Sequence, residues 1–265
     1  MTKIIGILNL TLDSFSDGGL YYDLNSAKKH IAEMINHGAD VIDIGAESTR
    51  SGFSDIDYSE QIRTLEPVID FINKNYSTSI SIDTRSSEVI KHFMNSNISF
   101  INDVSSGLND TEMLKCVAES GCNYIMTHMP KEHKEGNIKK FDNILYELEK
   151  FFKERIESCS SVGINQDKLI IDPGIGFGKS GDDNLKIIKN LDFIFNIHKN
   201  ICIGTSNKRY SSKLFDGVET KEDLKVANLA SFAISALEDV TYLRVHDVGI
   251  TKDTISVIEK TKNIN

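Results

Sequence analysis

Three residues suited to binding chemistry stand at the ends of separate apolar runs in this 265-residue sequence. Asp83 ends the run in "ISIDT", Asn102 follows the run in "FINDV", and Asp172 ends the run in "IIDPG". Carboxylates and amides are costly to bury unless a partner hydrogen-bonds them. If these three side chains converge, they suit a flat heterocycle with many hydrogen-bond donors and few charges.

Cationic and hydroxyl side chains follow the last two apolar runs. Arg244 and His246 lie in "LRVHDV", where a cationic pair of guanidinium fork and imidazole would favour an anion. Ser206 and Lys208 lie in "TSNKR", and Lys208 is the candidate position for a Schiff-base lysine.

Two polar loops follow the first two apolar runs. "NLTLDSFSDGG" begins at Asn9 and carries Thr11, Asp13 and Phe15. "GAESTRSG" carries Thr49 and Arg50. Loops of this composition can be solvated and idle, or they can close over a ligand.

The elements that must position these residues form a repeating pattern. Short β-rich apolar runs occur near residues 3–8, 40–44, 78–83, 98–102, 123–127, 168–172, 200–204 and 241–245. Segments of helical period alternate with them, among them 26–39, 143–159, 182–198 and 250–262. Eight strand–helix units predict an α/β protein, a (β/α)8 TIM barrel with one domain over residues 1–265. A doubly wound open sheet is the alternative, although it usually has fewer strands at this length. In a barrel the carboxyl ends of the strands meet at one mouth, so the polar residues would converge there.

Composition argues against several classes of function. The chain has 39 acidic and 30 basic residues and a formal net charge of −9, which disfavours nucleic-acid binding through a basic face. No apolar stretch is long enough to cross a bilayer, so we expect a cytoplasmic protein without membrane contact. Free buried thiols are expected for Cys116, Cys122, Cys159 and Cys202, which form no CxxC pair.

Other site patterns fit poorly. The first strand lacks the His-x-His of a metal hydrolase. "GIGFGKS" resembles a phosphate loop, but Pro173 stands where that motif needs glycine. We therefore interpret Gly174, Gly176 and Gly178 as a flexible loop beside Asp172.

Some polar residues also have a purely structural interpretation. Asp103, Thr84 and Asp247 follow strands, where such residues can cap a helix or turn the chain as readily as serve a site. His128 beside a strand end is interpreted as a satisfied polar residue.

Seven segments, taken in order, resemble the dihydropteroate synthase family of pterin-binding TIM barrels. They are "GILNLTLDSFSDGG", "DIGAESTRSG", "SIDT", "INDV", "DPGIGFGK", "TSNK" and "RVHDV". They extend from residue 6 to residue 248 and cover nearly the whole chain.

The resemblance implies a transferase of folate biosynthesis and a sulfonamide target. In the implied reaction, 4-aminobenzoate displaces pyrophosphate from 6-hydroxymethyl-7,8-dihydropterin diphosphate to form 7,8-dihydropteroate, with Mg2+ as cofactor. Catalytic and pterin-binding roles are implied for Asp83, Asn102, Asp172 and Lys208, and a pterin-binding role for Phe177.

Further roles follow from the same resemblance. Pyrophosphate binding is implied for Asn9, Arg244 and His246, with Asn9 also a metal ligand. Aminobenzoate binding within two lid loops is implied for Thr11, Asp13, Phe15, Thr49, Arg50 and Ser206. Related barrels commonly pair, so a homodimer that acts on small-molecule substrates is expected.

Four positions depart from the family pattern. Leu12 and Ser51 replace prolines, which predicts more flexible lids with an ordering cost of several tenths to about 1 kcal/mol each. Asn207 stands where a cation is usual, with Arg209 nearby, and Thr127 replaces a methionine that usually walls the pterin. These changes predict altered substrate affinity and altered sulfonamide sensitivity.

Two alternatives stay open at this point. One is a methyl-folate methyltransferase of the same barrel family, although the chain has no corrinoid-binding segment. The other is a pterin-binding protein that does not catalyse.

Overall fold

The computed structural model describes residues 1–10, 23–206, 208 and 220–264. Several residues named above lie outside these ranges, namely Thr11, Leu12, Asp13, Phe15, Asn207 and Arg209.

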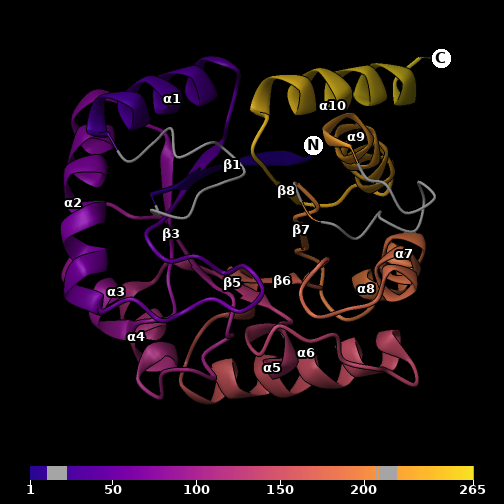
Figure 1. Cartoon of the computed structure of the whole chain (residues 1–265), viewed down its shortest axis with the longest axis horizontal. Coiled ribbons are helices and arrows are strands. Elements are labelled where there is room, and N and C mark those ends of the chain that lie inside the picture. The colour runs from indigo at the N-terminus through magenta and orange to yellow at the C-terminus, as the bar shows by residue number, and fades with distance from the viewer. Residues whose placement is uncertain (11–22, 207, 209–219, 265) are drawn as a thin grey trace.

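Eight parallel strands form one sheet in the order β6-β5-β4-β3-β2-β1-β8-β7 (Figure 1). The strands are β1 Lys3–Asn9, β2 Val41–Gly45, β3 Ser79–Asp83, β4 Phe100–Asp103, β5 Asn123–Thr127, β6 Leu169–Asp172, β7 Cys202–Ile203 and β8 Tyr242–Val245. A parallel bridge between Ile171 and Ile201 brings the two ends of the sheet together, so the barrel is nearly closed. The predicted TIM barrel is confirmed.

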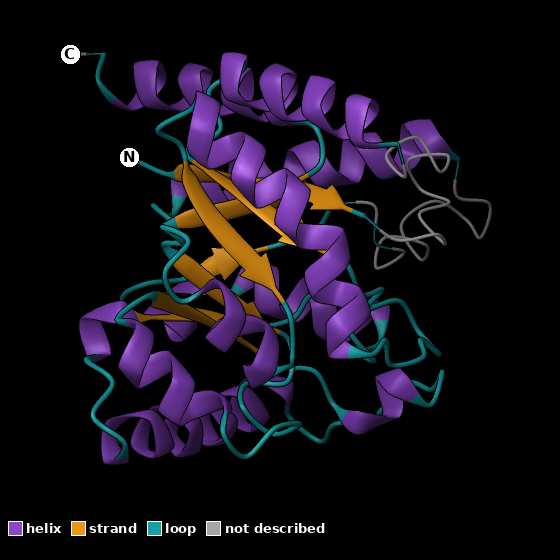
Figure 2. Cartoon of the chain, turned by 90° about the vertical axis from the view of Figure 1, so that its left-hand side faces the viewer, coloured by secondary structure: helices purple, strands orange, loops and turns teal. Residues whose placement is uncertain are grey.

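Helices follow the strands along the chain and surround the sheet (Figures 1 and 2). They are α1 Leu24–Asn36, α2 Tyr58–Asn75, α3 Ser87–Phe93, α4 Met113–Ser120, α5 Lys131–Lys134, α6 Ile144–Ser161, α7 Gly181–Lys189, α8 Leu191–Phe195, α9 Lys221–Leu237 and α10 Val248–Lys262, with a 3₁₀ turn η1 at Gln166–Lys168. Within the described ranges, no helix has both the length and the apolar character needed to cross a membrane.

The predicted helical segment at 182–198 is divided into α7 and α8. Asn190 leaves the helical backbone, with φ −120° and ψ 47°, and separates the two helices. Ser180 begins α7 with a capping box, in which its side chain accepts from the Asp183 N–H and the Asp183 side chain accepts from the Ser180 N–H.

The two faces of the barrel strands have different partners. Outward residues such as Ile4, Ile42 and Ile101 pack in the large core beneath the helices. Alternate residues on the same strands form a second apolar cluster, made of Ile5, Val41, Phe100, Ile125, Ile170, Cys202 and Tyr242. Because side chains alternate along a strand, the positions two residues further on belong to this same inner face. Those positions include Asp43, Asn102, Asp172 and Arg244.

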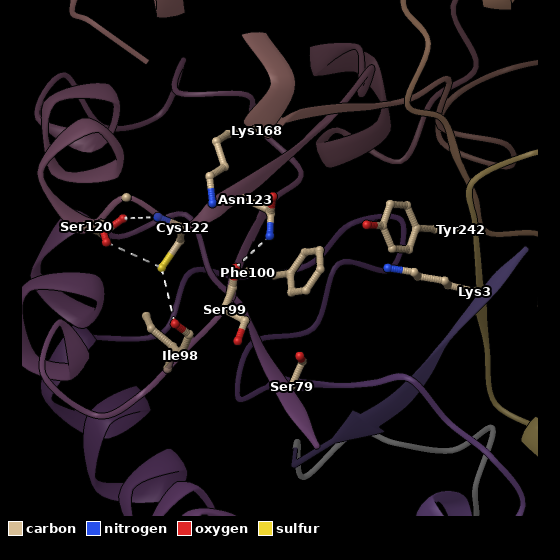
Figure 3. A pocket seen from close by; sticks show the side chains of 11 residues that line it. Lys3, Ser79, Ile98, Ser99, Phe100, Ser120, Cys122, Asn123, Lys168 and Tyr242 are labelled. Atoms are coloured by element: carbon tan, nitrogen blue, oxygen red, sulfur yellow. Dashed lines mark hydrogen bonds between the residues drawn. The ribbon is translucent and has the colours of Figure 1, made fainter. Parts of the chain in front are cut away.

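An aromatic pair lies at the amino-terminal end of the barrel. Phe100 and Tyr242 meet edge to face, with ring centroids 5.7 Å apart. A cavity of about 540 Å³ opens beside them, lined among others by Lys3, Asn123 and Lys168 (Figure 3). It lies at the first residues of the strands, at the opposite end from the predicted ligand-binding residues.

Gly6 in β1 is the position at which we expect an added methyl group to harm the fold. A Cβ there would lie 2.8 Å from Met34 Sδ and 3.1 Å from Val248 Cγ2. Gly6→Ala should therefore lower the free energy of unfolding by about 1–3 kcal/mol, measured by urea denaturation. Gly249→Ala is the matched control, since its Cβ would meet no atom closer than His37 Cγ at 3.4 Å. Equal stability of the two variants would contradict this account of the packing.

Candidate active site at the barrel mouth

The carboxyl ends of the strands bring three predicted residues to one mouth. Asp83, Asn102 and Asp172 end or nearly end β3, β4 and β6, and all three are buried. Asp83 and Asn102 are register partners in adjacent strands. Thr127, at the end of β5, is the register partner of Asp172 and so borders the same site.

Arg244 in β8 forms the centre of this mouth. Its Nε donates to Asp43 Oδ2 at 2.7 Å, and its Nη2 donates to Asp83 Oδ2 at 2.7 Å. Asn102 Nδ2 donates to the same Asp43 oxygen at 3.1 Å. Four side chains from four strands therefore share one buried network.

Asp43 is the member of this network that the sequence analysis did not assign. It is fully buried on β2, within the apolar stretch "VIDIG". A carboxylate inside such a stretch is expensive to bury without a cation, and this was the signal that could have identified it.

Burial and charge set the protonation of the network. Burial raises the pKa of Asp83 to about 7, although the Arg244 guanidinium opposes this shift. Burial alone would lower the pKa of Arg244, but the carboxylates of Asp43 and Asp83 more than reverse this, so the pKa is raised. Arg244 is thus a permanent cation next to a carboxyl that can change charge near neutral pH.

Lys208 and Asp172 form a second charged group in the mouth. Burial lowers the pKa of Lys208 to about 8, while the Asp172 carboxylate opposes the shift. Burial raises the pKa of Asp172, with opposing effects from Lys208 and from the Gly174 N–H, which donates to Asp172 Oδ1 at 2.7 Å. Lys208 Nζ lies 4.0 Å from the ring centroid of Phe177, which makes a cation–π contact.

The loop after β6 is held firmly, in contrast to the flexible loop predicted from its glycines. Lys179 is buried, and its Nζ donates to the carbonyls of His128 and Gly174 at 2.8 Å and of Phe177 at 3.3 Å. Gly176, whose φ is +80°, lets the Lys208 side chain pack close to the loop backbone, because a Cβ there would lie 2.8 Å from Lys208 Cδ. Lys179 was not among the predicted site residues, and its role is to fix this loop.

His246 and Ser206 join the ends of β8 and of the segment after β7. His246 Nδ1 lies 3.0 Å from Ser206 Oγ, and that hydroxyl also accepts from the His246 N–H at 3.3 Å. Burial, with the nearby Arg244 charge, lowers the pKa of His246 to about 3. His246 is therefore neutral at pH 7 and offers hydrogen bonding, in place of the positive charge expected from the sequence.

The loop after β2 is anchored by Arg85, which the sequence analysis did not assign. Arg85 is buried and pairs with Glu47 and Asp55, each at 2.7 Å. Its guanidinium also lies 4.7 Å from the ring centroid of Phe53. These contacts position the segment that carries Thr49 and Arg50.

Four polar residues near the strand ends, for which the sequence analysis gave a structural interpretation, make contacts within the protein. Asp103 accepts from the N–H groups of Ser105 and Gly107 and from the Tyr124 hydroxyl. Thr84 Oγ1 donates to Gln61 Oε1, and Asp247 caps α10. His128 packs against the rings of Phe141 and Phe151, but its buried Nδ1 has no hydrogen-bond partner in the described part of the chain, so the interpretation of His128 as a satisfied polar residue is wrong for that atom.

The structure thus brings most of the predicted residues that it describes together in three groups at the mouth. Asp83, Asn102 and Arg244 share one network, Asp172 and Lys208 lie with Phe177, and Ser206 contacts His246. Asn9 ends β1, while Thr49 and Arg50 lie on the loop after β2. Within residues 1–10, 23–206, 208 and 220–264, no group of three or more His, Cys, Asp or Glu could hold a metal ion.

Comparisons with known proteins point to one family. A family model described as "Pterin binding enzyme" matches residues 5–246. The chain is 36% identical to the dihydropteroate synthase of Escherichia coli strain K12 over 261 residues. This alignment covers 97% of this chain and 91% of that protein. A structure of Yersinia pestis dihydropteroate synthase in a sulfonamide drug complex matches with TM-score 0.92 and 30% identity, over 99% of this chain and 95% of that one. A structure of Xanthomonas albilineans dihydropteroate synthase with 4-aminobenzoic acid matches with TM-score 0.90 and 32% identity, over 100% and 94%.

The raised pKa of Asp83 predicts a pH dependence of stability. Between the ordinary carboxyl pKa near 4 and about 7, the folded protein keeps a proton that the unfolded chain releases, so the free energy of unfolding should fall as pH rises. Asp83→Asn removes this group, and the fall should become shallower by up to about 1.4 kcal/mol per pH unit.

Urea titrations of the wild type and Asp83→Asn at several pH values between about 4.5 and 6.5 measure this slope. Asp192→Asn, which changes an exposed carboxyl on α8, is the matched control. Parallel curves for the wild type and Asp83→Asn would show that the carboxyl of Asp83 does not titrate in this range.

Proposed function

The chain belongs to the pterin-binding enzyme family, and from this premise we propose that it catalyses the dihydropteroate synthase reaction. In this reaction the amine of 4-aminobenzoate attacks the methylene carbon of 6-hydroxymethyl-7,8-dihydropterin diphosphate. The bond from that carbon to the diphosphate oxygen breaks, the amine loses a proton, and 7,8-dihydropteroate and pyrophosphate leave. The observation that carries the proposal is the buried Arg244–Asp83–Asn102 network beside Lys208 and Asp172.

We assign the pterin site to Asp83, Asn102, Asp172 and Lys208, with Phe177 against the ring. A dihydropterin presents several N–H donors and a carbonyl, which match carboxylates, an amide and an ammonium. Departure of the diphosphate leaves positive charge on the pterin methylene, and the Asp83 and Asp172 carboxylates would stabilise it. An arylamine is already a nucleophile, so the site mainly positions the reactants and excludes water.

We assign the diphosphate to Asn9, Arg244 and His246. The Arg244 cation would attract the anion, and neutral His246 would add a hydrogen bond. An amide oxygen at Asn9 suits Mg2+, an oxygen-binding ion that usually takes its other ligands from substrate phosphates and water. When bound, Mg2+ would neutralise the charge that grows on the leaving group.

We assign the aminobenzoate side to the two loops that follow β1 and β2. Thr49, Arg50, Ser206 and Phe177 would line it, and Arg50 would attract the carboxylate of the substrate. Thr11, Asp13 and Phe15 belong to the same proposal and lie outside the described residues. The Xanthomonas albilineans relative is described with 4-aminobenzoic acid, which supports an aminobenzoate substrate for this chain.

We also propose a homodimer and a cytoplasmic location, with residues 1–265 as one pterin-binding domain. Exposed apolar side chains recur at helical spacing on α9, at Val226, Ala230, Ile234 and Leu237. Such a stripe favours burial against a second copy. The four free, buried cysteines fit a reducing compartment.

Pyrophosphate release tests the proposed reaction. With Mg2+ and the pterin diphosphate, release should depend on 4-aminobenzoate, and Asp83→Ala should reduce it at least about 100-fold because a buried contact to the pterin is lost. Asp192→Ala, on the exposed surface of α8, should retain wild-type release.

Other outcomes point elsewhere. Binding of the pterin diphosphate without amine-dependent release would favour a non-catalytic binding protein. Methyl transfer from a methyl-folate, without pyrophosphate release, would favour the methyltransferase alternative.

Ser51 leads to a prediction about sulfonamides, which would compete with 4-aminobenzoate for the same site. Ser51→Pro fixes a backbone angle in the loop after β2 and should lower its ordering cost by about 0.4–1 kcal/mol. Sulfonamide inhibition should therefore tighten about twofold to fivefold, measured as the inhibition constant against 4-aminobenzoate. Equal inhibition constants would remove the argument that Ser51 alters sulfonamide sensitivity.

A further inference from the structure

We propose that His133 is a positioning residue that joins the loop after β2 to the loop after β6 and thereby sets the geometry of the aminobenzoate side of the site. His133 lies in the short helix α5 and is buried. The inference rests on the proposed function only for its kinetic consequence, because the contacts themselves are independent of the substrate.

The imidazole ring reaches both loops at once. Its Nε2 lies 2.9 Å from the carbonyl oxygen of Thr49, and its Nδ1 accepts from the Gly178 N–H at 3.1 Å. A carbonyl can only accept, so Nε2 must carry the proton, while Nδ1 must be free of one to accept from Gly178. The two partners together select one neutral tautomer.

The backbone of His133 adds a second contact to the loop after β2. The Gly52 N–H donates to the His133 carbonyl oxygen at 3.4 Å. The side chain and the backbone of one residue therefore hold the chain on both sides of Arg50 and Ser51. Both positions have a proposed link to aminobenzoate or sulfonamide binding.

On its other side, His133 contacts the predicted substrate pocket through Phe177. The two rings meet edge to face, with centroids 4.9 Å apart, and Phe177 in turn carries the Lys208 ammonium. The approach is close, since a Cβ on Gly178 would lie 3.0 Å from Pro130 Cγ and 3.1 Å from His133 Cβ. A shift of the His133 ring would therefore move both the loop after β2 and the loop after β6.

The surroundings keep this ring neutral. Burial lowers the pKa of His133, the bond to the Thr49 carbonyl opposes this, and the positive charges of Lys208 and Lys179 lower it further. Neutrality matters because a proton on Nδ1 would turn the acceptor for Gly178 into a second donor.

Three substitutions separate the functions of the ring. His133→Gln can keep a donor near the position of Nε2 but loses the acceptor for Gly178. His133→Asn can keep an acceptor near Nδ1 but loses the donor to Thr49. His133→Phe keeps the aromatic contact with Phe177 and loses both hydrogen bonds. His92→Phe, at an exposed histidine on α3, is the matched control.

The kinetic measurement compares the change in the KM for 4-aminobenzoate with the change in the KM for the pterin diphosphate. We expect His133→Phe to raise the KM for 4-aminobenzoate about fivefold to tenfold, since two neutral hydrogen bonds are lost. Because His133→Phe keeps the ring against Phe177, its KM for the pterin diphosphate should stay within about twofold of the wild type. Equal increases in both KM values, or none in either, would overturn the inference.

Amide hydrogen exchange gives a readout that needs no turnover. Exchange in a peptide that spans residues 49–53 should be faster in His133→Phe and His133→Asn than in the wild type, with His133→Gln closer to the wild type. Unchanged exchange in this peptide, or a uniform increase over the whole chain, would overturn the inference. An inactive wild type would count against the proposed reaction alone, because the exchange result would still decide the role of His133.

Discussion

The pairing of Arg244 with Asp43 and Asp83 is the interaction on which the arrangement of the mouth depends. A guanidinium and two carboxyl groups are largely removed from water at the same place, and the loss of Arg244 would leave two buried carboxyl groups without their cation. The two ion pairs, together with the hydrogen bond that Asn102 donates to Asp43, offset part of the cost of removing these groups from water. A charged centre can therefore persist above an apolar layer that includes Ile5 and Ile125.

This arrangement also prepares the site for an anion. Asp83 and Asp172 both have raised pKa values because burial disfavours their charged forms, and Lys208 has a lowered one for the same reason. Arg244 is a fixed cation, since its two carboxylate partners favour the charged form. A substrate that brings its own negative charge and its own hydrogen-bond donors would complete the site, and this is the chemistry of a pterin diphosphate.

The sequence could predict the positions of strand-end residues, because one rule connects the end of a parallel strand to the mouth of a barrel. Asp83, Asn102, Asp172 and Arg244 follow from that rule alone. The contacts that hold the loops could not be predicted in this way, since they join residues far apart in the chain. Arg85 and Glu47 are 38 positions apart, Lys179 and the carbonyl of His128 are 51 apart, and His133 and the carbonyl of Thr49 are 84 apart. No local pattern encodes such pairs, and the glycines of the β6 loop indicated flexibility where Lys179 in fact fixes the backbone.

The two anchors of the β2 loop differ in kind, and the difference bears on how the loop could work. Its root is held by charge-assisted bonds between Arg85 and the carboxylates of Glu47 and Asp55, which are roughly twice as strong as neutral bonds. Its tip, on either side of Arg50, is held by neutral hydrogen bonds to His133. A loop built in this way keeps its root in place while its tip can be released at a smaller cost. Such a difference in bond strength suits a loop whose tip lies beside the proposed aminobenzoate site.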